Sequence, residues 1–160
     1  MDYHGIEGFL GSRASLAYDV AFLLELAVIP LFIHSLLLLL VRHDYQAHKR
    51  LQLIVTGMFA VAVGLFAFEF FAYDWRTRVG VEADAIPRIT YMTLTIHLAF
   101  LTITALIWLV LFLNALNKIP SPPGPCEFGP TYVFWLVLLG LQLFISTLTG
   151  WEFYMLAFCY

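Results

Sequence analysis

The sequence predicts an all-α, polytopic membrane protein with four transmembrane helices in one bundle. Of its 160 residues, 62% are hydrophobic and only 12% are charged, whereas soluble domains carry about 25% charged residues. The charged residues gather between long apolar runs, and a helix needs roughly 20 apolar residues to cross a bilayer. We therefore expect a single transmembrane domain over residues 1–160, with helices at about 14–41, 51–72, 88–116 and 131–158.

The first helix follows a short polar lead, residues 1–13, that contains three glycines. Ser12 or Ser15 can cap this helix, because a serine hydroxyl accepts a hydrogen bond from a free backbone N–H of the first turn. Pro30 lies inside the helix and predicts a kink. The helix carries three ionisable side chains: Asp19, Glu25 and His34.

Residues 42–50, RHDYQAHKR, predict a short, mostly basic turn before the second helix at 51–72. Gly57 and Gly64 lie seven apart on one face of that helix, where small residues let another helix approach closely. Glu69 lies near its far end. Basic residues number four on each side of the membrane, so the count alone does not orient the chain. The compact basic turn favours its own side as cytoplasmic, which puts both termini outside.

The remaining connections are a polar loop at 73–87 and a loop at 117–130 that contains five prolines. We expect the tyrosine and tryptophan of the first loop at the membrane interface. The prolines fix φ and remove backbone donors, so we expect the second loop to be extended and to contact a partner or the bundle. Polar residues mark one face of the fourth helix: Gln142, Ser146 and Thr149. Aromatic residues of this helix and the C-terminus fit interfacial belts: Trp135, Trp151, Tyr154 and Tyr160.

His97, near the middle of the third helix, is the leading candidate site residue. An ionisable side chain inside a membrane segment is by default a functional-site hypothesis. Thr90, Thr93 and Thr104 share its face, because residues three, four or seven apart stack on a helix. We expect this stripe to face protein or a ligand instead of lipid.

Depths along the helices group the other ionisable residues. Five of them belong to the outer half of the bundle: Asp19, Glu25, Glu69, His97 and Glu152. Three histidines belong to the inner half: His34, His43 and His48. An unpaired charge in lipid costs at least about 2.5–3.5 kcal/mol. We therefore expect His97 to lie close to at least one of Asp19, Glu25 and Glu69.

Three interpretations of these groups remain open. They form a structural polar knot, a metal or haem site with His97 as a ligand, or a site that handles protons or a quinone. The candidate metal ligands are His97, Glu69 and Asp19, and the candidate cofactor-binding residues are His97, His48 and His34. We assign no catalytic residue. The net charge of −3 gives no reason to expect a nucleic-acid partner.

Short segments in all four helices resemble, in order, the bacterial membrane family of unknown function numbered four-twenty. They are FLGSRASL (9–16) with Asp19 following, AHKRLQL (47–53), FEF around Glu69, IHLAF (96–100) and TGWEFYMLAF (149–158). That family includes the CtaM-like factors needed to assemble haem-copper cytochrome oxidases. The resemblance implies four helices and a role near oxidase biogenesis, and it singles out His48, Glu69 and His97. Relatives usually carry a histidine at the start of the fourth helix, but residues 126–135 contain none. This departure favours a structural subunit.

These arguments together predict a multi-pass protein of the bacterial cytoplasmic (inner) membrane. We expect a non-enzymatic accessory or assembly component of a respiratory or related electron-transfer complex. Its partners would be membrane lipids and other integral membrane subunits. The alternative is a small redox or carrier protein that binds haem or a metal such as copper through His97.

Overall fold

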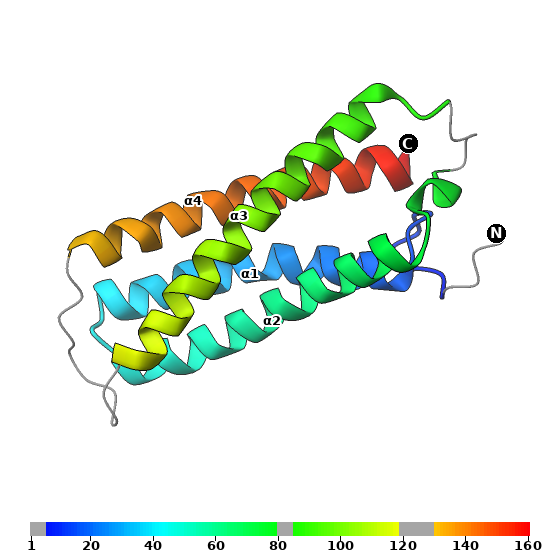
Figure 1. Ribbon diagram of the computed structural model, residues 1–160. Coiled ribbons are helices and arrows are strands. Elements are labelled where there is room, and N and C mark those ends of the chain that lie inside the picture. The colour runs from blue at the N-terminus through cyan, green and yellow to red at the C-terminus, as the bar shows by residue number, and fades with distance from the viewer. Residues whose placement is uncertain (1–5, 80–84, 119–129) are drawn as a thin grey trace.

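Four long helices form the molecule (Figure 1). The computed structural model describes residues 6–79, 85–118 and 130–160. The helices are α1 (Leu16–Leu40), α2 (Tyr45–Ala72), α3 (Arg88–Lys118) and α4 (Pro130–Tyr154), with the short helical turns η1 (Trp75–Arg78) and η2 (Met155–Cys159). All four long helices are long and apolar enough to cross a membrane. The predicted all-α, four-helix membrane fold is therefore confirmed, and the chain is a multi-pass membrane protein.

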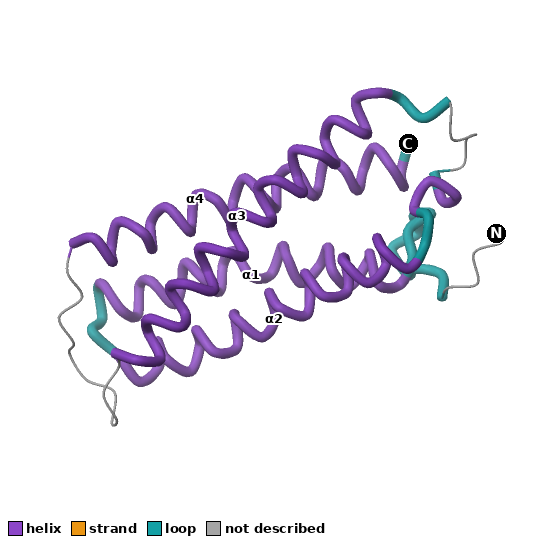
Figure 2. Tube along the Cα trace, viewed as in Figure 1, coloured by secondary structure: helices purple, strands orange, loops and turns teal. Residues whose placement is uncertain are grey.

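The bundle has two distinct ends (Figure 2). Residues 6–15, η1 and η2 lie together at one end, which we call the terminal end. The end at which α1 turns into α2 is called the hairpin end, and α3 ends and α4 begins there too. Most of the proline-rich loop predicted at 117–130 lies outside the described residues.

The helices pack as two antiparallel pairs. α1 packs along α2, α3 packs along α4, and α1 joins the two pairs through its contacts with α4. The backbones of α2 and α3, both described along their whole length, do not pack closely against each other. Side chains connect α2 and α3 instead. For example, the indole N–H of Trp108 donates a hydrogen bond to the hydroxyl of Thr56 (3.1 Å).

The boundary of α2 corrects the sequence prediction. Residues 42–50 were expected to form a turn, but α2 already begins at Tyr45. Asp44 caps it, with its carboxylate accepting a hydrogen bond from the backbone N–H of Ala47 (2.9 Å). Most of the residues from Tyr45 to Arg50 have good helix propensity, so the cap decides the boundary and the charge pattern does not. The actual connection is only four residues, 41–44.

The glycines of α2 also differ from expectation. A Cβ atom at Gly57 or Gly64 would meet nothing within 4 Å, so no described segment of this chain approaches them. Close approach occurs instead at Gly140 of α4, where a Cβ would lie 3.3 Å from the ring of Phe32. The small residue that allows helix packing is therefore in α4, at the contact with α1.

A polar layer separates two apolar clusters in the core. The cluster nearer the hairpin end includes Val28, Phe32, Phe59, Leu101, Trp108, Leu139 and Leu143. The cluster nearer the terminal end includes Tyr18, Trp75, Leu94, Phe153, Tyr154 and Phe158. Glu25, His97 and Ser146 lie between these clusters on α1, α3 and α4. The predicted polar stripe of α3 is buried as expected: Thr90, Thr93, His97 and Thr104 are at most 3% exposed.

The terminal end is closed by short segments. Residues 6–15 fold back on the bundle, where the N–H of Arg13 donates to the carbonyl of Phe158 (3.1 Å). Ser15 caps α1, because its hydroxyl accepts a hydrogen bond from the backbone N–H of Tyr18. It is one of the two serines that the sequence offered as caps. Trp75 was expected at the membrane interface, but it is buried against Tyr91 and Phe153. Its ring is therefore part of the closure at this end.

Candidate functional site

The candidate site is the polar layer, where α1, α3 and α4 meet. The Nδ1 atom of His97 donates to the backbone carbonyl of Ser146 (3.0 Å). The hydroxyl of Ser146 donates to the carboxylate of Glu25 (3.3 Å). His97 and Glu25 thus share Ser146 as a common partner. The prediction that His97 lies close to one of three carboxylates is confirmed, and the carboxylate is that of Glu25.

Gly150 makes room for this arrangement. It lies four residues after Ser146, on the same face of α4. A Cβ atom at Gly150 would lie 2.8 Å from Cε1 of His97 and 3.1 Å from Oε2 of Glu25. The imidazole and the carboxylate therefore occupy space that any other residue at this position would fill. A small residue four positions from a serine was the sequence signal for this close packing.

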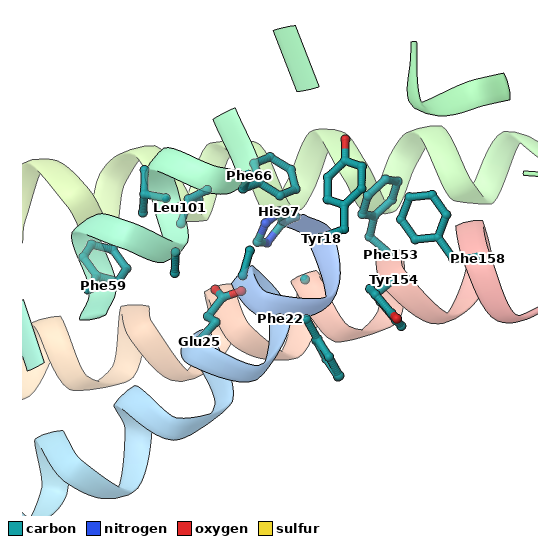
Figure 3. Close-up of a pocket in the computed structure, with 14 residues that line it drawn as sticks. Tyr18, Phe22, Glu25, Phe59, Phe66, His97, Leu101, Phe153, Tyr154 and Phe158 are labelled. Carbon is teal, nitrogen blue, oxygen red and sulfur yellow. The ribbon is translucent and has the colours of Figure 1, made fainter. Parts of the chain in front are cut away.

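A cavity of about 30 Å³ lies beside the two side chains. Figure 3 shows the Glu25 carboxylate and the His97 ring at this cavity, surrounded by aromatic rings. Phe66 meets the imidazole edge-to-face, with ring centroids 5.3 Å apart. One water needs about 10–15 Å³ measured this way, so the cavity has room for about two water molecules.

The hydrogen bond at Nδ1 determines what His97 can do chemically. A carbonyl oxygen only accepts, so Nδ1 must carry the proton that it donates to Ser146. In the neutral ring, Nε2 then keeps its lone pair and can accept a proton or bind a metal ion. His97 and Glu25 therefore form a pair that can bind water, hold a proton or offer two ligands.

Asp19 belongs to a different network. Its carboxylate is fully buried and accepts from the hydroxyl of Tyr154 (2.5 Å) and from the backbone N–H groups of Phe9 (2.6 Å) and Leu10 (2.9 Å). A Cβ at Gly8 would overlap this carboxylate. Asp19 thus ties residues 6–15 to α4. Tyr154, which was assigned to an interfacial belt, is buried here.

The predicted metal ligands are not gathered into one set. Asp19 is surrounded by the donors just described, and Glu69 is buried near the terminal end of α2 without lining the His97 cavity. Among the described residues, no three His, Cys, Asp or Glu side chains are grouped as metal ligands. The structure therefore does not bring His97, Glu69 and Asp19 together as one set of ligands.

The histidines at the hairpin end lie far from His97 along the helices. The Nδ1 atom of His48 donates to the carbonyl of Ser35 (2.9 Å), and the hydroxyl of Ser35 donates to Gln52 (3.1 Å). His48 therefore ties α2 to α1. His34 is exposed on α1 and faces away from the bundle interior. The structure does not bring His97, His48 and His34 together around one cofactor.

Comparison of the chain with protein-family models, with curated proteins and with solved structures gave no match.

Proposed function

We propose that the chain is a non-enzymatic accessory or assembly component of a respiratory or related electron-transfer complex in the bacterial cytoplasmic (inner) membrane. One observation carries the non-enzymatic part. Asp19, His48 and His97 are buried or partly buried, and each binds backbone atoms of its own chain. Side chains used in this way hold segments and helices together.

The size of the cavity supports the same conclusion. Pockets that bind small organic molecules and cofactors have volumes of about 300–1,000 Å³. The cavity beside His97 is about 30 Å³, and several aromatic side chains pack around it. A haem does not fit there without separating the helices, so the haem alternative is disfavoured by this geometry.

The outer surface suits contact with lipid or with other membrane subunits. Large apolar side chains are exposed on all four helices, including Phe68, Leu106, Leu141 and Phe144. In a bilayer these side chains contact lipid or the helices of a partner. The link to electron transfer rests on the resemblance of the ordered segments to the four-twenty family, of which AHKRLQL and IHLAF contain His48 and His97.

A second candidate function is metal handling, and one observation favours it. Nε2 of His97 keeps its lone pair, and His97 and Glu25 line the same cavity. An imidazole and a carboxylate are two ligands that several transition metals accept, including copper. A complete site would need further ligands from a partner protein. Such a metal site would be shared with the partner or occupied only transiently.

The test is purification of the tagged protein from membranes of its own host in a mild detergent. Co-purifying proteins are identified by mass spectrometry, and the same sample is analysed by visible absorption and for metal content. Electron-transfer subunits recovered in near-equal amounts, without a Soret band or copper, would support the main proposal. Recovery of the chain alone would contradict it.

The matched variant is His97→Gln. The amide of glutamine can donate to the Ser146 carbonyl but cannot replace Nε2 as a metal ligand. Copper that is present in the wild type and lost in this variant, with subunits still recovered, would establish the second candidate. Unchanged metal content in both samples would reject it.

A further inference from the structure

A second cavity lies at the hairpin end, away from the His97 site. It has a volume of about 60 Å³ and is formed by α2, α3 and α4. It lies where the backbones of α2 and α3 do not pack together, so side chains alone line its walls. None of its lining residues also lines the cavity beside His97.

The lining changes from polar to apolar with depth. His48, Lys49 and Gln52 come from the first two turns of α2, so they lie near the membrane surface. Lys49 is about 6 Å along the helix axis from the start of α2. Apolar residues line the deeper part, including Leu136 and Leu139, and Leu139 is about 13 Å from the start of α4. The cavity therefore suits a molecule with a polar head and an apolar tail.

The charge at the mouth is positive. Lys49 is half-buried, and no ion pair joins it to any residue that the structure describes. Arg42 and Arg50 are exposed at the same end. In the described parts of the chain, Asp44 is the only acidic residue at this end, and one of its oxygens is used to cap α2. The mouth therefore favours an anionic head group.

We propose that this cavity binds an anionic glycerophospholipid from the surrounding bilayer. The phosphate lies at Lys49 and Gln52. The cavity has room for about four to six water-sized groups, so only the first few methylenes of one acyl chain enter between α2 and α3, and the rest of the lipid stays in the bilayer. Basic pockets between transmembrane helices recognise anionic lipids in this way. A free anion would not explain the apolar depth, and a purely apolar ligand would not explain the cation at the mouth.

The test uses the full-length protein, purified in detergent and depleted of lipid. Phosphatidylglycerol and phosphatidylcholine with identical acyl chains are titrated separately, and bound lipid is counted by native mass spectrometry. We expect one phosphatidylglycerol to bind preferentially. Equal binding of the two lipids, or binding of neither, would overturn the proposal. If neither lipid binds, the remaining candidate occupant of the cavity is a protein segment.

Two pairs of variants locate the site. Lys49→Gln should weaken phosphatidylglycerol binding about fivefold, whereas Arg50→Gln, which removes a neighbouring exposed charge, should change it less than about twofold. Ala115→Phe fills the apolar part of the cavity and should abolish preferential binding. Leu113→Phe, on the exposed face of the same helix, should not.

Two further measurements keep the result interpretable. Each variant must keep the thermal-unfolding midpoint of the wild type in detergent, so that loss of lipid is not loss of fold. Glycerol phosphate, which has the head group without acyl chains, should not displace phosphatidylglycerol. Displacement by glycerol phosphate, or equal effects of Lys49→Gln and Arg50→Gln, would overturn the assignment of this lipid to this cavity.

Discussion

The two ends of the bundle are built in different ways. At the terminal end, residues 6–15, η1 and η2 cover the helices, and Asp19 binds three donors from two segments. At the hairpin end, α2 and α3 remain apart and a cavity opens between them. Polar residues therefore have different structural roles at the two ends. Asp19 closes one end, whereas Lys49 lies at the mouth of the cavity at the other end and has no ion pair among the described residues.

The largest effect is expected from Asp19→Ala. The substitution leaves three donors without their acceptor: the buried Tyr154 hydroxyl and the partly buried backbone N–H groups of Phe9 and Leu10. Loss of one partner of a buried charged network typically costs about 3–5 kcal/mol. Unfolding in detergent measures this loss, and hydrogen exchange should show residues 6–15 opening. Asp74→Asn, at an exposed cap, is the control and should change stability far less. Equal effects would mean that Asp19 does not hold the terminal end closed.

His97→Ala should follow, with a loss of about 3 kcal/mol. It removes a buried ring and leaves a hole between Phe66 and Gly150, and such large-to-small changes cost about 2–5 kcal/mol. His97→Gln keeps a donor for the Ser146 carbonyl and should be milder. The free energies of unfolding of the two variants are compared. If glutamine is as harmful as alanine to stability, the hydrogen bond to Ser146 is not the main contribution of His97.

Alanine substitutions of two glycines should change stability in opposite directions, one at the polar layer and one on the face of α2 that contacts no described segment. Gly150→Ala places a methyl group against His97 and Glu25, and overpacking costs about 1–3 kcal/mol. Gly64→Ala meets nothing within 4 Å and gains helix propensity of up to about 1 kcal/mol. Thermal-unfolding midpoints should therefore fall for the first and hold or rise for the second. A fall for Gly64→Ala in the purified chain would show that this face is covered.

The smallest effect is expected at the side-chain bridge between α2 and α3. Thr56→Val removes the acceptor of the Trp108 indole, and hydrogen bonds between membrane helices contribute about 0.6 kcal/mol on average. Thr102→Val is the matched control, because the Thr102 hydroxyl bonds only within α3. A loss of several kcal/mol for Thr56→Val, measured by unfolding in detergent, would show that α2 and α3 are held together more firmly than their spacing indicates.

The face of each helix was easier to predict than the neighbour that the face meets. The stripe of Thr90, Thr93, His97 and Thr104 was predicted to be buried, because three- and four-residue spacing determines which residues share a face. Gly57 and Gly64 satisfy the same spacing rule but contact no described part of the chain. Spacing says which residues point together, but it does not say whether a helix of the same chain lies opposite.

The candidate site was predicted in part. Depth along the helices placed Asp19, Glu25, Glu69 and His97 in one half of the bundle, and the structure agrees that His97 meets a carboxylate. The prediction named three carboxylates without choosing among them, because rise per residue measures position along the axis and not the direction in which a side chain points. The choice of Glu25 depends on the rotation of α1 and on the space left by Gly150. Ser146 supplies its backbone carbonyl, which residue identity does not reveal.

The sequence by itself determined the four membrane helices and the buried face of α3, since local spacing and hydropathy decide these features, and it narrowed the cap of α1 to Ser12 or Ser15. Only the tertiary structure decided that Asp19 closes the terminal end, that Glu25 accompanies His97 and that α2 stands apart from α3. Transmembrane helices are apolar on nearly every side, so hydropathy carries little information about which helix packs against which. The few polar and small side chains carry that information, and their partners are set by rotation and stagger between helices.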